Sequence, residues 1–499
     1  EGMANHIQRA VAEISGAVLL YAPVASEEQF INAISYLIRR MDENTGRENF
    51  LRHSFRLKSD SGQWRYLKNQ FLQAYDYKDL VPTDTFRIQD RNTEKFPEKT
   101  STYYSGEFTN EPDTDFTLSA NRNWAGEIRK KWKAGPGSEP IRIPLAIAGE
   151  EIFDGKNTRS IYDSAQVNSQ GKEEILVALN ALADAGDIEK AAAAAKSDPD
   201  GWREKSCKER HQILSRAAME IRKARADLIG SAASGSGKVF YESDPEVSEA
   251  VDFMEFYPHS ARYFCDLENI ECRGRGVGVV ISPWNFPIAI PCGGIVSALA
   301  AGNTVIFKPA SPAVLVGWVL CNCLWRAGIS KNTLQFVPCS GSDTGDKLTG
   351  HPDVDFIIFT GGTDTGLHIL KERPDVFMAG ETGGKNATIV TAMSDRDLAI
   401  SNIMHSAFSN SGQKCSATSL LILEQEVYGN EKFKRQLVDA AASYPVGSQW
   451  DFKNRMGPLI RPPRDDLKNA LNSLQPGESW ALKPKMIDNN PYMWTPGIK

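Results

Sequence analysis

The stretch NSGQKCSA, from Asn410 to Ala417, contains the residue types best suited to covalent chemistry. Cys415 lies on a turn of small residues and directly follows a lysine. A thiolate attacks an electrophilic carbon far better than a thiol does, and a nearby cation or helix N-terminus favours the thiolate. Cys415 is therefore a candidate nucleophile, although free cysteines are more often buried and structural. The residues from Ser416 to Glu424 predict a small-residue entry into a buried apolar strand.

Two further polar residues have the types that such a nucleophile requires. Glu381 lies in MAGETGGKN, where a carboxylate on a flexible glycine turn could activate water after a covalent intermediate has formed. Asn285 lies in ISPWNFP, and a carboxamide held between two prolines is a rigid donor to a developing oxyanion. Each residue has an ordinary alternative role, a solvated loop charge or a turn former. Their occurrence together with Cys415 favours catalysis.

The motifs ISPWNFP, FTGGTDTG, ETGGKN and GQKCSA occur in this order. Together with the interval between Glu381 and Cys415, they resemble the aldehyde dehydrogenase superfamily. The resemblance implies that Cys415 is the nucleophile, Glu381 the general base and Asn285 the oxyanion donor. It also places Ser416 against the aldehyde substrate.

Short β-branched strands alternate with helices from residue 276 to 381, which predicts a doubly wound sheet. Ligands bind at the carboxyl ends of such strands, and the free N–H groups of a glycine turn that opens a helix can meet a phosphate. The resemblance implies an NAD site here, formed by Ile281, Ser282, Pro283, Trp284, Lys308, Ser311, Gly341, Gly345, Phe359, Thr360, Gly361, Gly362 and Thr363.

Ser311 departs from the family's pattern. Many NAD-preferring members carry a glutamate three residues after the lysine that corresponds to Lys308. Such a carboxylate chelates the ribose hydroxyls and repels a 2′-phosphate. The neutral hydroxyl of Ser311 weakens this preference, although the resemblance still favours NAD over NADP.

The first 60 residues have a different character. Residues Ala17 to Val24 predict a short apolar strand stopped by proline, and residues Ser26 to Asn44 predict a capped helix. Tyr36, Arg39 and Arg40 lie within about one turn of this helix and could converge on one carboxylate. The alternative is an amphipathic helix with a solvated basic face.

YAPV followed by YLIRRMDEN resembles the last strand and helix of the proline dehydrogenase barrel. The resemblance implies that Arg39 and Arg40 bind the carboxylate of proline, that Tyr21 and Tyr36 line its pocket, and that Glu43 approaches FAD. A proline dehydrogenase segment fused to an aldehyde dehydrogenase is typical of the bifunctional proline utilization A flavoenzymes.

The expected fold class is α/β. An aldehyde dehydrogenase fold, with a doubly wound NAD-binding domain and an α/β catalytic domain, would follow the last strand and helix of a (β/α)8 barrel. We expect the barrel end at 1–60, an extended connector at 61–115, the NAD-binding domain with N-terminal helices at 116–381 and the thiol domain at 382–499. A helix is expected to begin at Glu249. The family's closing motifs are not seen, so we expect an internal fragment of a longer polypeptide.

Composition narrows the range of partners. The net charge of −6 argues against nucleic acid, which requires a basic face. Eight cysteines suggest a reducing compartment, and Cys321 and Cys323 lie in an apolar helical run without a second pair, so no metal is expected. No segment has the about 18 uninterrupted apolar residues of a membrane helix, and the N-terminus is not a signal peptide. We therefore expect a soluble cytoplasmic protein that could lie peripherally at a membrane.

The predicted function is NAD-dependent oxidation of L-glutamate γ-semialdehyde, formed from pyrroline-5-carboxylate, to glutamate. The same enzyme would oxidise proline with FAD and pass the electrons to a quinone at the membrane. Further copies of the chain would form a homo-oligomer. Two alternatives are a dehydrogenase for another aldehyde and a non-catalytic scaffold with the same fold.

Overall fold

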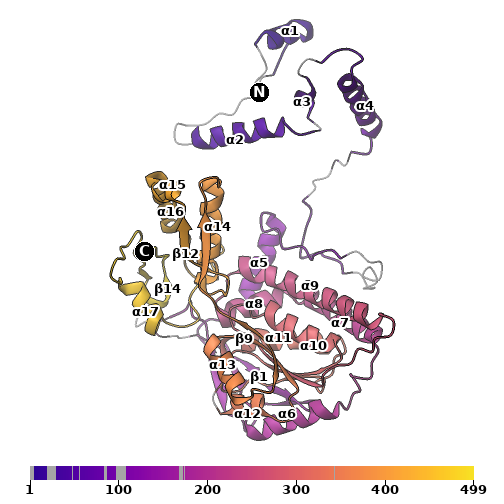
Figure 1. The fold of residues 1–499 in the computed structure, drawn as a ribbon, viewed down its shortest axis with the longest axis vertical. Helices are drawn as coiled ribbons and strands as arrows, with labels where there is room; N and C mark the ends of the chain where they lie inside the picture. Colours follow the sequence, from indigo (N-terminus) through magenta and orange to yellow (C-terminus); the bar gives the residue numbers. More distant parts are fainter. Residues whose placement is uncertain are drawn as a thin grey trace. The chain divides into compact units, whose positions relative to one another are not determined.

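The computed structural model describes residues 5–19, 30–47, 49–54, 57–81, 83, 87–96, 108–167, 172, 175–341 and 343–499. The chain divides into two compact units, Glu1–Ile88 and Gln89–Lys499 (Figure 1). Each unit is described by itself. Within the described ranges, no helix is long and apolar enough to cross a membrane.

The described part of the small unit contains four helices: α1 (Asn5–Ser15), α2 (Phe30–Glu43), α3 (Phe50–Ser54) and α4 (Gly62–Tyr77). The helix predicted from Ser26 is confirmed over the range of α2. The predicted strand lies mostly outside the described residues, and its first three residues, 17–19, form no strand. The prediction of an extended connector from residue 61 is wrong over α4, where the Ser61 hydroxyl accepts the N–H of Trp64 at 3.1 Å and caps a helix of 16 residues.

The large unit is built around a seven-stranded sheet in the order β10-β9-β6-β7-β8-β2-β3. The five strands from β10 to β8 are parallel, whereas β2 pairs antiparallel with both β8 and β3. The doubly wound sheet predicted for residues 276–381 is therefore confirmed. The strands are β2 (Leu145–Ile147), β3 (Glu150–Ile152), β6 (Val277–Ile281), β7 (Thr304–Lys308), β8 (Leu334–Phe336), β9 (Phe356–Gly361) and β10 (Phe377–Thr382).

Helices cover both faces of this sheet because successive strand residues point to opposite sides. Val280 packs into the core on one face and Val279 into the core on the other. The first core is formed with α7 (Cys207–Lys223), α8 (Arg225–Ser236), α9 (Phe240–Cys265), α10 (Ala289–Ala300) and α11 (Val314–Arg326). The second is formed with α6 (Ala185–Ser197), α12 (Thr344–Gly350) and α13 (Thr363–Glu372). Figure 1 shows the two groups of helices with the sheet between them.

Three smaller sheets accompany these layers in the described structure. The order β1-β5-β4 joins β1 (Ile141–Ile143), β5 (Leu176–Ala181) and β4 (Thr158–Tyr162), while helix α5 (Ser119–Trp132) packs on α8. Beyond the large sheet, β11 (Asn386–Val390) pairs in parallel with β12 (Thr418–Leu423). Helices α14 (Arg396–Phe408), α15 (Gln425–Tyr428) and α16 (Glu431–Ala442) share a third core with these strands. The chain ends with α17 (Asp465–Asn472), β13 (Met486–Ile487) and β14 (Asn490–Trp494).

Three expectations differ from the structure. The strand after Cys415 is not buried, because Leu420 in β12 is 56% exposed. Helix α9 begins at Phe240, nine residues before the predicted start at Glu249, since Pro245 is accommodated inside the helix. Cys207 and Cys265 form a disulfide between α7 and α9, although the cysteine content had suggested reduced thiols. The prediction that Cys321 and Cys323 lie in a helix core is confirmed.

Candidate active site

The loop before Cys415 has an unusual backbone. After α14, Asn410, Ser411 and Gly412 take φ angles of 48°, 56° and 71°, all in the left-handed region. Asparagine and glycine tolerate this region best, because a short polar side chain or none avoids the clash with the backbone. These three residues turn the chain sharply, and Cys415, three positions further on, is exposed.

Three hydrogen bonds from distant segments hold this loop. The carboxylate of Glu242 in α9 accepts the backbone N–H of Asn410 at 2.6 Å. The hydroxyl of Ser411 donates to the carbonyl of Gly457 at 2.6 Å. The N–H of Ile460 donates to the side-chain oxygen of Gln413 at 2.9 Å. The surrounding fold, and not the cysteine, therefore determines where the loop lies.

Asn285 contacts the same loop. Its side-chain nitrogen Nδ2 donates to the carbonyl of Gln413 at 2.9 Å. The backbone carbonyl of Asn285 accepts a hydrogen bond from Nζ of Lys238 at 2.7 Å and another from Nδ2 of Asn410 at 3.2 Å. A carboxamide has two N–H donors, so one of them is left for a substrate oxygen beside the cysteine.

A buried ion pair fixes the turn that carries Asn285. Lys238 and Glu246 pair with each other, and each side chain is only 3% exposed. Glu246 also accepts the N–H groups of Ile288 and Ala289, at 3.0 and 3.3 Å, where α10 begins. Nζ of Lys238 lies 4.1 Å from the centre of the Phe286 ring. The pair thus ties α9 to both ends of the Asn285 turn.

Glu381 lies in a strand, so the prediction of a flexible turn is wrong. It occupies β10 and is paired in register with Thr360 of β9, because the parallel ladder continues to Thr382. Its side chain is exposed and forms no ion pair or hydrogen bond within the described part of the chain. After the following glycines, Nδ2 of Asn386 donates to the carbonyl of Cys415 at 2.5 Å. The segment that follows Glu381 is therefore hydrogen-bonded to the backbone of the nucleophile.

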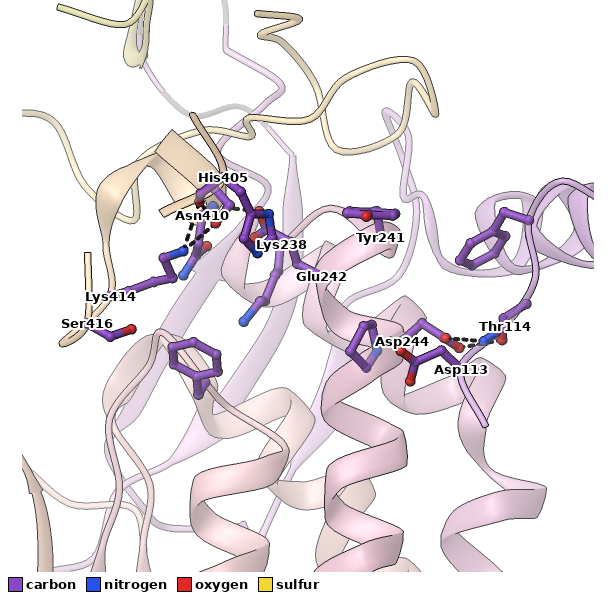
Figure 2. Close-up of a pocket in the computed structure, with 14 residues that line it drawn as sticks. Asp113, Thr114, Lys238, Tyr241, Glu242, Asp244, His405, Asn410, Lys414 and Ser416 are labelled. Carbon is purple, nitrogen blue, oxygen red and sulfur yellow. Dashed lines mark hydrogen bonds between the residues drawn. The ribbon is translucent and has the colours of Figure 1, made fainter. Parts of the chain in front are cut away.

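A cavity of about 350 Å³ opens beside the nucleophile loop (Figure 2). One side carries Lys238, Glu242, Asn410 and Lys414, while Asp113 belongs to the opposite side. The remaining lining residues are Thr114, Phe116, Tyr241, Asp244, Pro245, Phe286, His405, Ser409 and Ser416. The cavity is therefore both charged and partly aromatic.

Burial controls the ionisation of two groups in this cavity. It raises the pKa of Glu242 to about 6, although Lys238 and the Asn410 N–H both favour the carboxylate. Burial lowers the pKa of Lys414, which Glu242 partly offsets. The ammonium of Lys414 donates to the carbonyl of His405 at 3.1 Å. The cavity lining thus combines three acidic side chains, Asp113, Glu242 and Asp244, with two lysines, Lys238 and Lys414.

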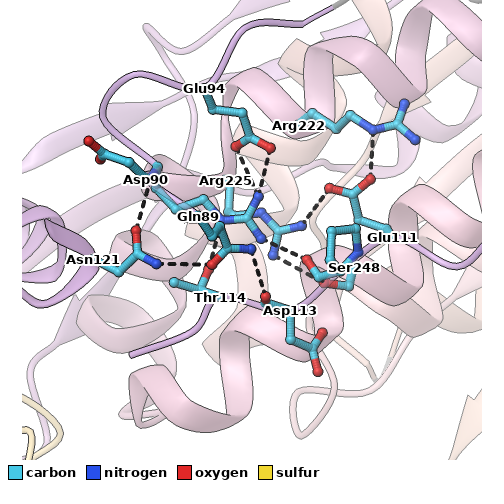
Figure 3. Close-up of polar contacts among 12 residues, drawn as sticks. Gln89, Asp90, Glu94, Glu111, Asp113, Thr114, Asn121, Arg222, Arg225 and Ser248 are labelled. Carbon is cyan, nitrogen blue, oxygen red and sulfur yellow. Dashed lines mark hydrogen bonds and ion pairs between the residues drawn. The ribbon is translucent and has the colours of Figure 1, made fainter. Parts of the chain in front are cut away.

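The far wall of the cavity is held by a buried network (Figure 3). The N–H of Thr114 donates to the Asp244 carboxylate at 2.6 Å, and Arg225 pairs with Asp244 at 2.9 Å and with Glu111 at 3.0 Å. The Arg225 side chain is 3% exposed. The prediction of an extended connector is therefore wrong for this part of residues 61–115 as well. Its charged residues had suggested a solvated segment, but they pair with one another and can therefore be buried.

The residues predicted to bind NAD gather at one edge of the large sheet. Ile281 at the end of β6 is in register with Lys308 of β7 on one side and with Phe359 of β9 on the other. Gly345 adjoins Lys308, because a Cβ at Gly345 would lie 3.7 Å from Cε of the lysine. Thr360 and Gly361 complete β9, Gly362 caps α13 and Thr363 begins it.

This edge fits a dinucleotide. The Ser282 hydroxyl is buried and has no hydrogen-bond partner among the described residues, as expected of a group that meets a ligand. A Cβ at Gly341 would meet nothing within 4 Å, so the backbone there is open to close approach. Gly362 supplies no side-chain cap, so the first N–H groups of α13 are free to bind a phosphate. Pro283 and Trp284 are half-buried in the adjoining turn.

The residues predicted to bind proline are close together within α2. The guanidinium carbons of Arg39 and Arg40 lie 5.7 and 5.8 Å from the centre of the Tyr36 ring. Arg40 also pairs with Glu43 at 2.7 Å. Tyr21 lies outside the described residues.

Several residues of the site were not identified from the sequence. Lys238, Glu242 and Glu246 are spaced four apart, and this repeat of charges across the start of α9 was the available signal. Pro245 concealed it, because a proline argues against a helix interior. Nothing in the local sequence indicated the other contacts, made by Asn386, Asn410 and Gln413.

Comparison with known proteins identifies the family. Residues 160–475 match the aldehyde dehydrogenase family, and residues 1–53 match proline dehydrogenase. The 1-pyrroline-5-carboxylate dehydrogenase of Geobacillus sp. (strain WCH70) is 35% identical over 371 residues, which cover 71% of this chain and 70% of that protein. The Thermus 1-pyrroline-5-carboxylate dehydrogenase with bound NAD is 32% identical with a TM-score of 0.65, over 71% of this chain and 70% of that one.

A longer structure matches along the whole chain. Proline Utilization A from Corynebacterium freiburgense is 31% identical with a TM-score of 0.73, and the match covers 100% of this chain. The chain spans only 43% of the length of that protein. The family match and the extent of identity to the dehydrogenases agree. The chain belongs to the aldehyde dehydrogenase family.

Proposed function

We propose that the chain oxidises L-glutamate γ-semialdehyde, the open form of pyrroline-5-carboxylate, to glutamate with NAD as the oxidant. The observation that carries this proposal is the pair of hydrogen bonds from Asn285 to Gln413 and from Asn386 to Cys415, which joins three motifs around one thiol. The names of the dehydrogenase relatives and the NAD bound to the Thermus structure support the substrate and the cofactor.

The residues divide the reaction between them. The Cys415 thiolate adds to the aldehyde carbon, and the resulting oxyanion is held by Nδ2 of Asn285 and the Cys415 N–H. The residues from Ile281 to Thr363 at the sheet edge would hold NAD, which would supply the acceptor for a hydride. Loss of that hydride from the aldehyde carbon would leave a thioester on Cys415. Glu381 takes a proton from the water that attacks the thioester, glutamate leaves, and the thiol is restored.

The cavity suits an amino-acid substrate. Glu242 is ionised at neutral pH, since its pKa is about 6, and one of its oxygens has no hydrogen-bond partner among the described residues. That oxygen can accept the ammonium group of the semialdehyde, while Lys414 and Ser416 contribute polar groups on the side of the nucleophile.

Glu381→Gln should separate the two chemical stages. A carboxamide cannot accept the proton of water, so the thioester should form at the normal rate and hydrolyse slowly. We expect a burst of one NADH per active site and a steady rate lower by a factor of about 10² to 10⁴. Glu372→Gln, an exposed glutamate at the end of α13, is the matched control and should turn over normally. A parental steady rate in Glu381→Gln would refute the assigned base.

Three substrates separate this proposal from its alternatives. If NADH forms from pyrroline-5-carboxylate but not from acetaldehyde or propionaldehyde at the same concentration, the semialdehyde is supported as the substrate. Faster oxidation of a simple aldehyde favours a dehydrogenase of other specificity. No NADH from any aldehyde, with NAD still bound, identifies a scaffold.

We further infer that the first 60 residues belong to a proline-oxidising site. The match to proline dehydrogenase and the cluster of Tyr36, Arg39 and Arg40 support this. In that site the two arginines would bind the proline carboxylate, Tyr21 and Tyr36 would line the pocket, and Glu43 would face FAD. The flavin would pass its electrons to a quinone. The protein would be cytoplasmic and could lie peripherally at a membrane, and copies of the chain would form a homo-oligomer.

Arg39→Met and Arg40→Met test the second site in the complete polypeptide. Loss of one guanidinium leaves the proline carboxylate poorly paired at a cost of about 2 kcal/mol, so the KM for proline should rise about thirtyfold. Oxidation of supplied semialdehyde should remain normal, because the two reactions use separate sites. Arg9→Met on α1 is the control for a lost surface charge. If the KM for proline does not change, α2 is only a solvated basic helix.

A further inference from the structure

A third cysteine lies beside the disulfide that joins α7 to α9. Cys207 begins α7 and Cys265 ends α9, so the disulfide links two helix ends that are 58 positions apart. Cys272 is an exposed free thiol, and its Sγ donates to the carbonyl of Phe264 at 3.5 Å. Phe264 directly precedes Cys265, so the free thiol lies against the backbone of one disulfide partner.

The segment that carries Cys272 is not held by the core. It follows α9 without regular structure, and none of the side chains from 266 to 275 is buried. Asn269 takes a φ of 63°, in the left-handed region that asparagine tolerates, and turns the chain after the helix. Few buried contacts restrain such a segment, so Cys272 can reach the sulfur of Cys265 without disturbing the helices.

A buried arginine favours the departure of Cys207. Nη2 of Arg210 donates to Sγ of Cys207 at 3.2 Å. The arginine is only 6% exposed, and it is fixed by the carbonyls of Ala300 and Lys205, which accept from its other donors. A thiolate released at Cys207 would therefore meet a positioned cation. A stabilised thiolate is the better leaving group in thiol–disulfide exchange.

We propose that these three cysteines form a thiol–disulfide exchange site, in which Cys272 replaces Cys207 as the partner of Cys265. Cys272 loses its proton to water, and its sulfur forms a bond with Sγ of Cys265. The bond between Cys207 and Cys265 breaks, and its electron pair stays on Cys207 as a thiolate beside Arg210. One disulfide is lost and one is formed, so the exchange needs no external oxidant or reductant.

The exchange changes what the cross-link restrains. A bond across 58 positions ties the end of α9 to the start of α7, whereas a bond from Cys265 to Cys272 closes only a local loop. The longer cross-link restricts the unfolded chain more, so the exchanged form should unfold at a lower denaturant concentration. Disulfides in reducing compartments are mostly transient or redox-sensing, and an exchangeable bond suits such a role. The site would thus adjust the stability of the large unit and not the chemistry at Cys415.

Peptide mapping of the full chain, purified without reductant, distinguishes the two cross-links. Acid stops the exchange, and N-ethylmaleimide in denaturant then labels every free thiol before digestion. Trypsin cuts after lysine and arginine, so Cys207 lies in the peptide 206–208, whereas Cys265 and Cys272 share the peptide 263–273. The resting form yields the two peptides joined, with a label on Cys272. The exchanged form yields a labelled 206–208 peptide and a 263–273 peptide with an internal disulfide.

We expect both forms in the parent, with about a tenth of the molecules or more exchanged. Cys272→Ser should yield no labelled 206–208 peptide, and Cys207→Ser should yield only the internal disulfide. The midpoint of denaturant unfolding should be lower for Cys207→Ser than for Cys272→Ser, because only the latter keeps the long cross-link.

Arg210→Met tests the cation at the leaving sulfur. The exchanged fraction should fall about threefold or more, while Arg210→Lys, which keeps the charge, should retain part of it. Arg216→Met, another arginine of α7, is the matched control and should exchange as the parent does. A parent that shows only the bond between Cys207 and Cys265, or no disulfide at all, would overturn the inference. An unchanged exchanged fraction in Arg210→Met would overturn the role given to the arginine.

Discussion

Replacing Cys415 by alanine is expected to abolish aldehyde oxidation and to leave the dissociation constant for NAD nearly unchanged. The variant lacks the sulfur from which the proposed thioester is made, so the rate of NADH formation should fall by a factor of about 10⁴ or more. The loop should keep its conformation, because Asn410, Ser411 and Gln413 hold it through bonds that do not involve sulfur. The rate with pyrroline-5-carboxylate and a fluorescence titration with NAD measure the two quantities.

Cys272→Ala is the control for this experiment. Cys272 and Cys415 are both exposed free cysteines in the described structure, but only Cys415 lies in the loop that Asn285 and Asn386 contact. Cys272→Ala should therefore retain full activity, and iodoacetamide should inactivate it at the parental rate. Full steady-state activity in Cys415→Ala would end the proposed mechanism.

Lys238→Met should impair both catalysis and stability. The variant leaves Glu246 buried without its partner, which should lower the free energy of unfolding by about 3–5 kcal/mol. It also removes the bond to the Asn285 carbonyl, so the carboxamide is no longer held where the oxyanion forms. The loss of one preorganised donor lowers kcat by a factor of about 10² to 10³. Denaturant unfolding and steady-state kinetics measure the two effects.

Glu255→Gln and a double variant test whether Lys238 positions Asn285 or only stabilises the fold. Glu255 is another buried, ion-paired carboxylate of α9, remote from the cavity, so its loss should lower stability without changing kcat. Asn285→Ala should lower kcat by itself, and adding Lys238→Met to it should cost little more, because the donor to be positioned is already absent. Full additivity of the two effects would show that Lys238 does not act through Asn285.

The elements that could be predicted from the sequence are those with a local cause. β-branched runs between helices indicated the parallel sheet, and its strand ends placed Lys308 and Phe359 at one edge. Small residues around Cys415 indicated an accessible thiol, which is exposed in the structure. The roles of Cys415, Glu381 and Asn285 stay predictions, although hydrogen bonds now join the segments that carry them.

The features that could not be predicted depend on partners far along the chain. Glu242 meets Asn410 across 168 positions, and Thr114 meets Asp244 across 130. A charged stretch indicates solvation until the arginine that neutralises it is known, which is why residues 89–115 were taken for a connector. Glu381 was assigned to a turn because glycines flank it in the sequence. The strand conformation of this segment comes from its pairing with β9, a partner that the local sequence does not contain.

The bonds that hold the nucleophile loop also bear on the order of folding. Its partners are separated from it by 168, 128 and 47 positions, so the chain must close long loops before any of these contacts can form. Contacts between remote segments form slowly, whereas α9 and α14 can form early from local contacts. A newly made or partly folded chain therefore displays the thiol before it has an oriented donor, and the chemistry begins only when the tertiary structure is complete.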